Sequence, residues 1–378
     1  MSRVLLRSLF ALAVVAAAVL IGWRVLKPAE VLATVRPPLA PARMDGPGAT
    51  GQLATAPLIV AGQVRVYASK RQVRADAPVD AKTVYTAVWS FRRWPEQLSG
   101  VVASGATVVS RWSDGDLVAI DGATGRIVWR AAGPPGPGFE GHRTGSATVW
   151  APAGLRVAGP SVLVTAGGQL FAYAMSTGTP IWSATCAQAF TTAAAAQVVC
   201  PSGVFDAATG APVASFPPGP YTPVGCDVAS SSCAGLRDGA GHGWLTTSPA
   251  PVRATPLDRP DADVAAGLVV DPDGHAVDAV TGAARHDYPA GTQVLGASSG
   301  RAVLLTPDRT LLAVDPRTGV TIASFPLVHK REGTDWDPGR WQVTERYVAV
   351  ERLRPDRPDD PDTPGYYFSA DPVVVAAI

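Results

Sequence analysis

This sequence of 378 residues has little charge of either sign. Charged residues make up 17% of the chain, and 32 Lys and Arg side chains balance 31 Asp and Glu side chains, so the formal net charge is +1. A surface that binds nucleic acid needs an excess of positive charge. The composition therefore gives no electrostatic case for a nucleic-acid partner.

Asparagine is absent, and lysine occurs only at Lys27, Lys70, Lys82 and Lys330. Arginine and alanine are abundant instead, a bias typical of genomes rich in G and C. Glycine and proline are frequent, with 38 and 35 residues. Many short strands joined by tight turns would give this balance.

Only four cysteines are present: Cys186, Cys200, Cys226 and Cys233. They form no Cys-x-x-Cys motif, and His242 is the only nearby histidine, so a metal site is a poor interpretation. Four cysteines permit three pairings. Pairing neighbours closes the shortest loops, so we expect the disulfides Cys186–Cys200 and Cys226–Cys233, with free buried thiols as the alternative.

Long apolar runs are missing except at the N-terminus. An uncharged run from Ser8 to Trp23 follows Arg3 and Arg7 and precedes Arg24. We expect residues 1–26 to form a signal anchor, a transmembrane helix that holds the rest of the chain on the extracytoplasmic side of the cell membrane. A cleaved signal sequence and a buried helix are the alternatives. No cysteine directly follows the run, which excludes a bacterial lipoprotein anchor.

Catalytic and cofactor motifs are also missing. No serine lies in a Gly-x-Ser-x-Gly elbow, and the five histidines are dispersed. The glycine-rich stretch Gly133–Gly141 lacks the lysine and the following helix of a phosphate loop. The aspartates of 356–362 lie in a proline-broken stretch that we interpret as a solvated loop, and Asp271–Gly274 reads as a turn without the glutamate of a calcium loop. We therefore expect no catalytic, cofactor-binding or metal-binding residues.

What the sequence does contain is a repeated turn, first seen in GDLVAIDGATGRIVWR from Gly115 to Arg130. Asp can bond backbone amides at the start of the turn, and Gly can take a positive φ at its end. Five copies end in Thr-Gly, and their expected structural residues are Asp121, Gly125, Gly178, Asp206, Gly210, Asp278, Gly282, Asp315 and Gly319. An aromatic residue follows each copy, namely Trp129, Trp182, Phe216, Tyr288 and Phe325, and we expect it to pack into the neighbouring repeat.

The turn glycines are 53, 32, 72 and 37 residues apart. A period of roughly 35–40 residues with four short strands per unit predicts a β-propeller, an all-β fold. The spacing of 72 indicates one degenerate unit between Gly210 and Gly282, and that of 53 indicates an insertion near Gly133–Gly141.

The ends of the chain decide the number of blades. Residues 27–56 are rich in Pro, Ala and Gly and read as a linker, so we expect the propeller to span 57–378. The strand candidates Leu58–Tyr67 and Thr83–Phe91 could join Arg346–Leu353 and Tyr366–Ile378 in one composite blade. That arrangement predicts seven blades, and eight follow if the two ends form separate blades.

The units resemble the repeat of PQQ-like propellers, in which Ala-x-Asp-x-x-Thr-Gly follows a strand and precedes a tryptophan. Ala119–Trp129 matches this pattern closely. From about Pro57 to Ile378 the chain is similar to membrane-anchored PQQ-binding-like repeat proteins of the actinobacterial type, distant relatives of the propeller lipoprotein of the outer-membrane β-barrel assembly machine. Quinone-dependent dehydrogenases share the repeat, and the resemblance implies that they use adjacent cysteines and a calcium ion held by Glu, Asn and Asp. This chain has neither adjacent cysteines nor asparagine, so we expect no cofactor and no enzyme activity.

The resulting hypothesis is a non-catalytic extracytoplasmic scaffold that is tethered to the membrane and binds a protein or an envelope component. The alternative is a sensor that binds a small ligand in the central channel, and a quinone-dependent dehydrogenase is the weakest interpretation. The insertions Gly133–Trp150 and Arg354–Gly365 are the expected contact surfaces, because long loops on a rigid scaffold often carry recognition.

Overall fold

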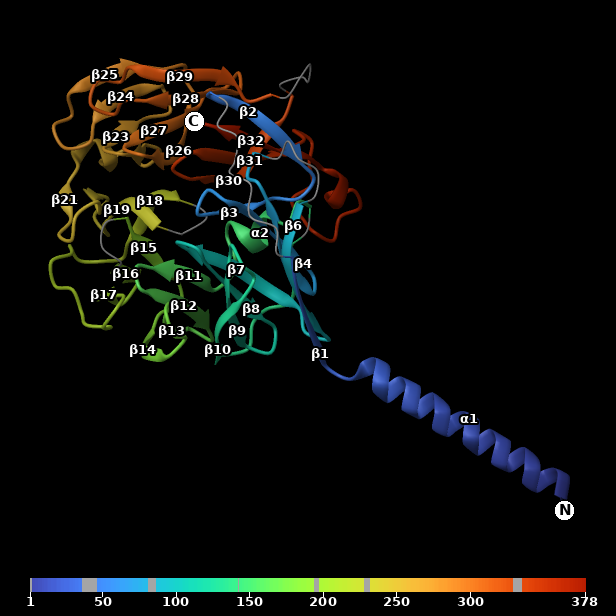
Figure 1. The fold of residues 1–378 in the computed structure, drawn as a ribbon. Coiled ribbons are helices and arrows are strands. Elements are labelled where there is room, and N and C mark those ends of the chain that lie inside the picture. Colours follow the sequence, from blue (N-terminus) through green and yellow to red (C-terminus); the bar gives the residue numbers. More distant parts are fainter. Residues whose placement is uncertain are drawn as a thin grey trace.

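The structure, a computed structural model, describes residues 2–35, 46–80, 86–141, 143–193, 197–227, 232–328 and 335–378. One long helix projects from a ring of small sheets (Figure 1). This helix, α1 (Ser2–Leu26), has a mean hydropathy of 1.6 over Arg7–Arg24, and none of that window is buried. It is therefore not a core helix of the ring. Its length and composition suit a membrane span, a property that it shares with a signal sequence.

The first four blades follow each other around the ring (Figure 1). Blade 1 consists of β3 (Leu58–Val60), β4 (Val64–Ser69), β5 (Gln72–Ala77) and β6 (Thr86–Trp94), and β1 (Ala29–Thr34) adds a fifth strand at its outer edge. Blade 2 consists of β7 (Leu98–Ser104), β8 (Thr107–Trp112), β9 (Asp116–Asp121) and β10 (Ile127–Ala132). Blade 3 consists of β11 (Leu155–Ala158), β12 (Ser161–Ala166), β13 (Gln169–Ala174) and β14 (Pro180–Thr185). Blade 4 consists of β15 (Phe190–Thr192), β16 (Gln197–Cys200) and β17 (Gly203–Asp206).

The remaining four blades complete the circle. Blade 5 consists of β18 (Thr222–Asp227), β19 (Ser232–Arg237), β20 (Gly243–Leu245) and β21 (Val252–Arg253). Blade 6 consists of β22 (Asp263–Ala265), β23 (Leu268–Val270), β24 (His275–Asp278) and β25 (Ala284–Asp287). Blade 7 consists of β26 (Gln293–Ser298), β27 (Arg301–Leu305), β28 (Thr310–Val314) and β29 (Thr321–Pro326). Blade 8 combines β30 (Asp337–Val343), β31 (Tyr347–Leu353) and β32 (Ala370–Ala377) with β2 (Gly48–Leu53).

Short helices occupy some of the connections. These are α2 (Ser146–Val149), the 3-10 helix η1 (Thr255–Asp258) after blade 5, and η2 (Tyr366–Phe368) between β31 and β32. Blades 4 and 5 share one hydrogen-bonded sheet, because β15 pairs in parallel with β19. The other blades form separate antiparallel sheets.

The propeller class is confirmed, and the described strands form eight blades instead of seven. The six internal units run from β7 to β29, and the degenerate unit between Gly210 and Gly282 is blade 5. Residues 58–94 form blade 1 and the C-terminal strands form most of blade 8, which gives the second of the two counts that the sequence allowed.

The composite blade has a different composition from the predicted one. The C-terminal strand β32 pairs with β2, with Ala376 opposite Ala49, whereas Leu58–Tyr67 belongs to blade 1 (Figure 1). The predicted linker 27–56 thus contains the strands β1 and β2, and both pair with strands of the ring. Gly48–Leu53 has no apolar alternation, so its strand conformation depends on pairing with the apolar strand β32.

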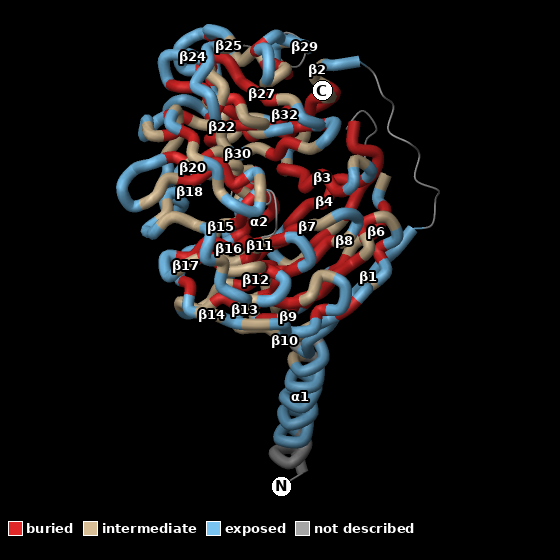
Figure 2. Tube along the Cα trace, turned by 90° about the vertical axis from the view of Figure 1, so that its left-hand side faces the viewer, coloured by how far each residue is buried: buried red, intermediate tan, exposed pale blue. Residues whose placement is uncertain are grey.

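The core lies between the faces of adjacent blades, in a band around the middle of the ring (Figure 2). Its largest cluster joins blades 8, 1 and 2 and includes the fully buried Trp89, Trp112 and Trp150. Both expected disulfides are present. Cys186–Cys200 fixes the segment after β14 to β16, and Cys226–Cys233 joins β18 to β19.

Candidate functional site

The repeated turns follow the third strand of their blades. In the first copy, the Oδ1 atom of Asp121 accepts hydrogen bonds from the backbone amides of Ala123 and Thr124 at 3.1 and 2.8 Å. The turn closes at Gly125, whose φ is +75° and whose amide donates to the Asp121 carbonyl at 2.8 Å. The same aspartate bonds recur at Asp206 and Asp278, and Asp315 accepts from the amide of Arg317. Gly178, Gly210, Gly282 and Gly319 all have positive φ.

Aromatic side chains of one blade contact the turn of the next. The indole of Trp129 in blade 2 donates to the carbonyl of Met175 in blade 3 at 2.7 Å. Trp182 in blade 3 donates to the carbonyl of Ala207 in blade 4 at 2.9 Å. Each indole lies against the turn glycine of the next blade, where a Cβ atom would come within 3 Å of the ring.

The other three aromatic residues take different positions. The Tyr288 hydroxyl donates to the Gly319 carbonyl of blade 7 at 2.9 Å, and burial raises the pKa of Tyr288 to about 12. Phe325 packs against the cluster between blades 7 and 8. Phe216 lies half-buried in the loop after β17, outside any strand.

Sequence reasoning missed Trp89. The indole N–H of Trp89, in β6, donates to the Gly122 carbonyl of blade 2 at 2.8 Å. Trp89 thus links blade 1 to blade 2 in the way that Trp129 links blade 2 to blade 3. A signal was available, because Asp80-Ala81-Lys82-Thr83 repeats the turn motif with Val84 in the place of glycine.

The insertion Gly133–Trp150, predicted as a contact surface, turns inward at its C-terminal end. The buried Arg111 guanidinium holds its first residues by donating to the carbonyls of Pro134 and Pro135 at 3.2 and 2.9 Å. Burial lowers the pKa of Arg111. Further along, α2 lies near the middle of the ring in both views (Figures 1 and 2). The insertion therefore brings α2 against strands of blades 8, 1 and 2.

A buried carboxylate anchors this inward end. Glu351 of β31 is 2% exposed and accepts hydrogen bonds from the hydroxyls of Thr144 and Ser146, the latter at 2.8 Å. The indole of Trp150 donates to the Pro57 carbonyl at 2.9 Å. A buried charge needs such partners to offset the loss of hydration. These contacts fix α2 against blades 8, 1 and 2.

Arg143 connects the two insertions that the sequence nominated separately. Its guanidinium lies 3.9 Å from the ring centroid of Tyr366 and donates to the carbonyl of Pro358 and, at 3.4 Å, to that of Tyr366. The second insertion is also tied to β30, because Arg357 pairs with Asp337 at 3.0 Å. His142, the neighbour of Arg143, lies outside the described residues.

The 3-10 helix η2 directly follows the predicted insertion Arg354–Gly365 and presents two exposed aromatic side chains. Tyr367 is 55% exposed and Phe368 is 78% exposed. We call this surface the η2 tip, defined by Tyr367 and Phe368. Exposed aromatic rings on a fixed loop are typical of protein-binding surfaces.

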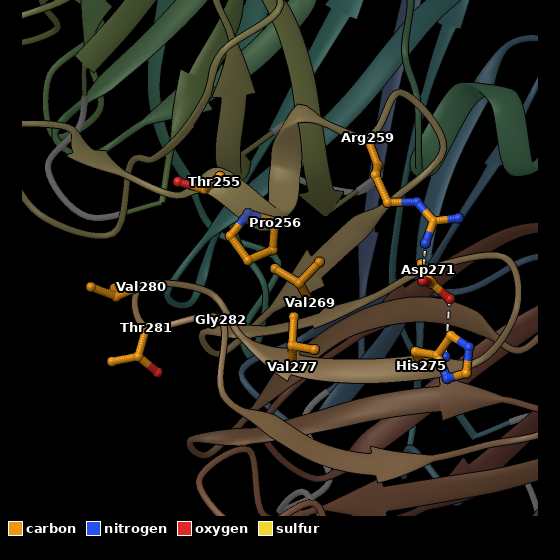
Figure 3. A pocket seen from close by; sticks show the side chains of 10 residues that line it. All are labelled: Thr255, Pro256, Arg259, Val269, Asp271, His275, Val277, Val280, Thr281 and Gly282. Carbon is orange, nitrogen blue, oxygen red and sulfur yellow. Dashed lines mark hydrogen bonds and ion pairs between the residues drawn. The ribbon is translucent and has the colours of Figure 1, made fainter.

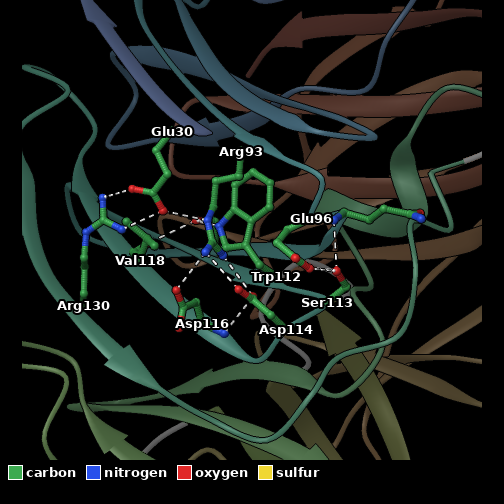
Figure 4. A network of polar contacts seen from close by, with 11 residues as sticks. Glu30, Arg93, Glu96, Trp112, Ser113, Asp114, Asp116, Val118 and Arg130 are labelled. Atoms are coloured by element: carbon green, nitrogen blue, oxygen red, sulfur yellow. Dashed lines mark hydrogen bonds and ion pairs between the residues drawn. The ribbon is translucent and has the colours of Figure 1, made fainter. Parts of the chain in front are cut away.

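A polar network fixes β1 to the ring (Figure 4). The Arg93 guanidinium is 10% exposed and pairs with Glu30 of β1 at 2.8 Å and with Asp114 and Asp116 of blade 2 at 2.9 Å each. Glu30 also pairs with Arg130 at 2.7 Å, and the hydrogen bond from Arg130 is the main cause of the lowered pKa of Glu30. We call this network the β1 clamp.

A cavity of about 480 Å³ lies between blades 5 and 6 (Figure 3). Val269, Val277 and Pro256 form its apolar part, and Arg259 pairs with Asp271 at its polar end. The hydrogen bond with Asp287 raises the pKa of His275, which lines the cavity. The predicted turn Asp271–Gly274 closes this end, since Asp271 accepts from the amides of Asp273 and His275.

Among the described residues, no group of three or more His, Cys, Asp and Glu side chains is placed to hold a metal ion. The family model described as outer membrane protein assembly factor BamB matches residues 48–146 and 113–211. Over residues 48–211 the chain is similar to PQQ-like repeat proteins, and its described strands form a β-propeller.

Solved structures similar to this repeat protein include the crystal structure of BamB from Moraxella catarrhalis, which is 17% identical with a TM-score of 0.45 and covers 92% of this chain and 97% of that chain. The C-terminal WD40 domain of Sif2 is 8% identical with a TM-score of 0.47 and covers 88% and 98%. A europium-containing methanol dehydrogenase is 14% identical with a TM-score of 0.42 and covers 89% and 93%. No curated protein matches the chain.

Proposed function

We propose that this PQQ-like propeller is a non-catalytic scaffold, anchored in the cell membrane by α1, that binds a protein or envelope component on the extracytoplasmic side. The two disulfides support an oxidising compartment. The apolar, unburied α1 supports the anchor. The family description, an assembly factor, supports a role in binding proteins.

The joined insertions carry this proposal. Arg143 fixes the second insertion to the first, so the η2 tip is held on ordered backbone. Its exposed aromatic side chains would lose little conformational entropy on binding, because their supporting loop is already packed. The Phe368 side chain is 78% exposed, so a partner that covers its ring would gain binding free energy from the burial of apolar surface.

Photo-crosslinking in intact cells tests the proposal. In one variant, a photoreactive phenylalanine analogue replaces Phe368. In the control variant, the same analogue replaces Val320, which lies in the blade 7 turn and is 61% exposed. We expect a discrete protein adduct from position 368 and none from position 320. An absence of protein adducts at 368, or the same adducts at both positions, would contradict the η2 tip as a binding surface.

The cavity between blades 5 and 6 favours a second candidate, a sensor of a small ligand. Its mixed apolar and charged lining is typical of ligand pockets. Native mass spectrometry of the purified chain would detect a retained small molecule. Loss of that molecule in a Val277→Trp variant, which fills the cavity, would favour the sensor over the scaffold.

A further inference from the structure

The membrane-side end of blade 1 is placed directly beside α1. Only Lys27 and Pro28 separate α1 from β1, and two residues span at most about 7 Å. The register then fixes what lies there, because Ala29 pairs with Trp94 of β6 and Arg92 pairs with Gln72 of β5. The β4–β5 turn and the C-terminal end of β6 are therefore the parts of the ring next to the helix.

Several cationic side chains lie at this end of blade 1. Lys70 and Arg92 are exposed, and Arg71, in the β4–β5 turn, is half-buried. Within the described part of the chain, no ion pair joins Lys27, Lys70, Arg71 or Arg92 to a carboxylate. The neighbouring acids are engaged elsewhere: Glu30, Asp114 and Asp116 pair with Arg93, and Glu96 accepts from the Ser113 hydroxyl at 2.8 Å. Glu96 keeps its negative charge, and the four cations outnumber it, so the net charge at this end is positive.

An aromatic side chain completes the surface. Trp94 is 38% exposed, and the Arg71 guanidinium lies 4.2 Å from its ring centroid. Arg71 is oriented by its hydrogen bond to the Pro95 carbonyl at 3.1 Å. Tryptophan is enriched at the level of lipid headgroups, where its ring has an apolar body and a polar N–H group.

We infer that this juxtamembrane patch, defined by Lys27, Lys70, Arg71, Arg92 and Trp94, binds the phosphate headgroups of anionic phospholipids in the membrane that holds α1. The inference rests on the proposed anchoring by α1. A lipid surface is the occupant that fits, because the short connection to α1 leaves the patch facing the bilayer. Each cation near an anionic surface contributes about 1 kcal/mol.

Reconstitution of the full chain tests the inference. The chain is inserted into two kinds of vesicle, one of phosphatidylcholine alone and one of equal parts phosphatidylcholine and phosphatidylglycerol. Both contain a trace of phospholipid with a photoreactive headgroup. We expect crosslinks to the peptides around Lys70 and Arg92 mainly in the anionic vesicles. The Lys70→Glu variant replaces an exposed cation of the patch. Its yield of lipid crosslinks in the anionic vesicles should fall at least about fivefold, the ratio that corresponds to the loss of about 1 kcal/mol of binding free energy.

The matched control is Arg126→Glu, an exposed cation in the blade 2 turn that lies beside Thr34 at the far end of β1 from Lys27, and it should leave the yield unchanged. Equal yields in both lipid compositions, or no loss in Lys70→Glu, would overturn the inference. Alkaline carbonate extraction of the same vesicles separates the two proposals. A chain that is extracted contradicts the anchor, whereas a chain that stays inserted but crosslinks elsewhere contradicts only the patch.

Discussion

Trp129 and Gly178 belong to neighbouring blades, and each explains the residue type of the other. The indole needs a partner for its N–H group, and the Met175 carbonyl supplies it at 2.7 Å. The ring can approach the turn only because Gly178 has no side chain, since a Cβ atom there would lie 2.4 Å from Cε3 of Trp129. The repeat therefore encodes contacts between blades as well as the turn within one blade.

A pair of alanine variants separates these two roles of glycine. Gly178→Ala adds a Cβ atom both at φ +73° and against Trp129, so we expect a loss of about 2–4 kcal/mol in unfolding free energy. Gly282→Ala meets only the backbone strain at φ +68°, because no atom lies within 4 Å of its Cβ position, and should cost about 1 kcal/mol. Urea unfolding of both variants measures the difference. Equal losses would show that the indole does not need the empty position.

Tyr288 makes stability depend on pH in the alkaline range. Burial raises its pKa to about 12, above the value of about 10 in the unfolded chain. The folded form therefore holds the phenolic proton more tightly, and this contribution is complete below pH 10 and is lost as the pH rises toward 12. Tyrosinate absorbance of the folded Tyr288→Phe variant should lack one group that titrates near pH 12. Loss of a group that titrates near pH 10 instead would contradict the buried hydrogen bond to Gly319.

At the scale of elements, blades 4 and 5 both contain short strands. The strand β15 has three residues and β21 has two, and the two blades share one sheet. Both disulfides lie in these two blades: Cys200 is in the four-residue strand β16, and Cys233 lies where β19 pairs with the short strand β15. We infer that the disulfides compensate for short strands, since a cross-link reduces the entropy of the unfolded chain.

Paired cysteine variants test this compensation. Replacing Cys186 and Cys200 by alanine opens a loop with a sequence separation of 14, and replacing Cys226 and Cys233 opens one of 7. Each change should cost about 2–3 kcal/mol, more for the longer loop, and should raise amide exchange mainly in blades 4 and 5. Exchange that rises evenly around the ring would contradict a local role.

The turns and strands that repeat could be predicted because their signals are local. Asp121 and Gly125 act within five residues, and Trp129 stands at a fixed offset from its turn. The strand β2 could not be predicted, because Gly48–Leu53 becomes a strand only against β32 at the other end of the chain. The inward course of the first insertion depends on Glu351, which lies more than 200 residues from Thr144 and Ser146. No local pattern specifies a contact at that separation.

At the scale of the whole molecule, both ends of the chain are fixed to the ring. The strand β2 closes blade 8, so the sheet that contains the C-terminus also contains a strand from the N-terminal part (Figure 1). The β1 clamp then joins the continuation of α1 to blades 1 and 2. Under the proposed anchoring by α1, a propeller attached in this way would have a defined orientation toward the membrane, with the juxtamembrane patch facing the lipid.

The arrangement around the axis leads to the last prediction, which concerns the quinone enzymes that share this repeat. The cysteines pair across strands, so none is available to form a bridge between adjacent residues. The inward end of the first insertion, fixed by Glu351 and Trp150, occupies the middle of the ring. We therefore expect the purified chain, supplied with PQQ and calcium, to show no quinone absorbance after desalting and no dye reduction with alcohols or sugars. Saturable PQQ binding accompanied by dye reduction would replace the scaffold with an enzyme, and the inserted segment would then have to form one wall of its cofactor site.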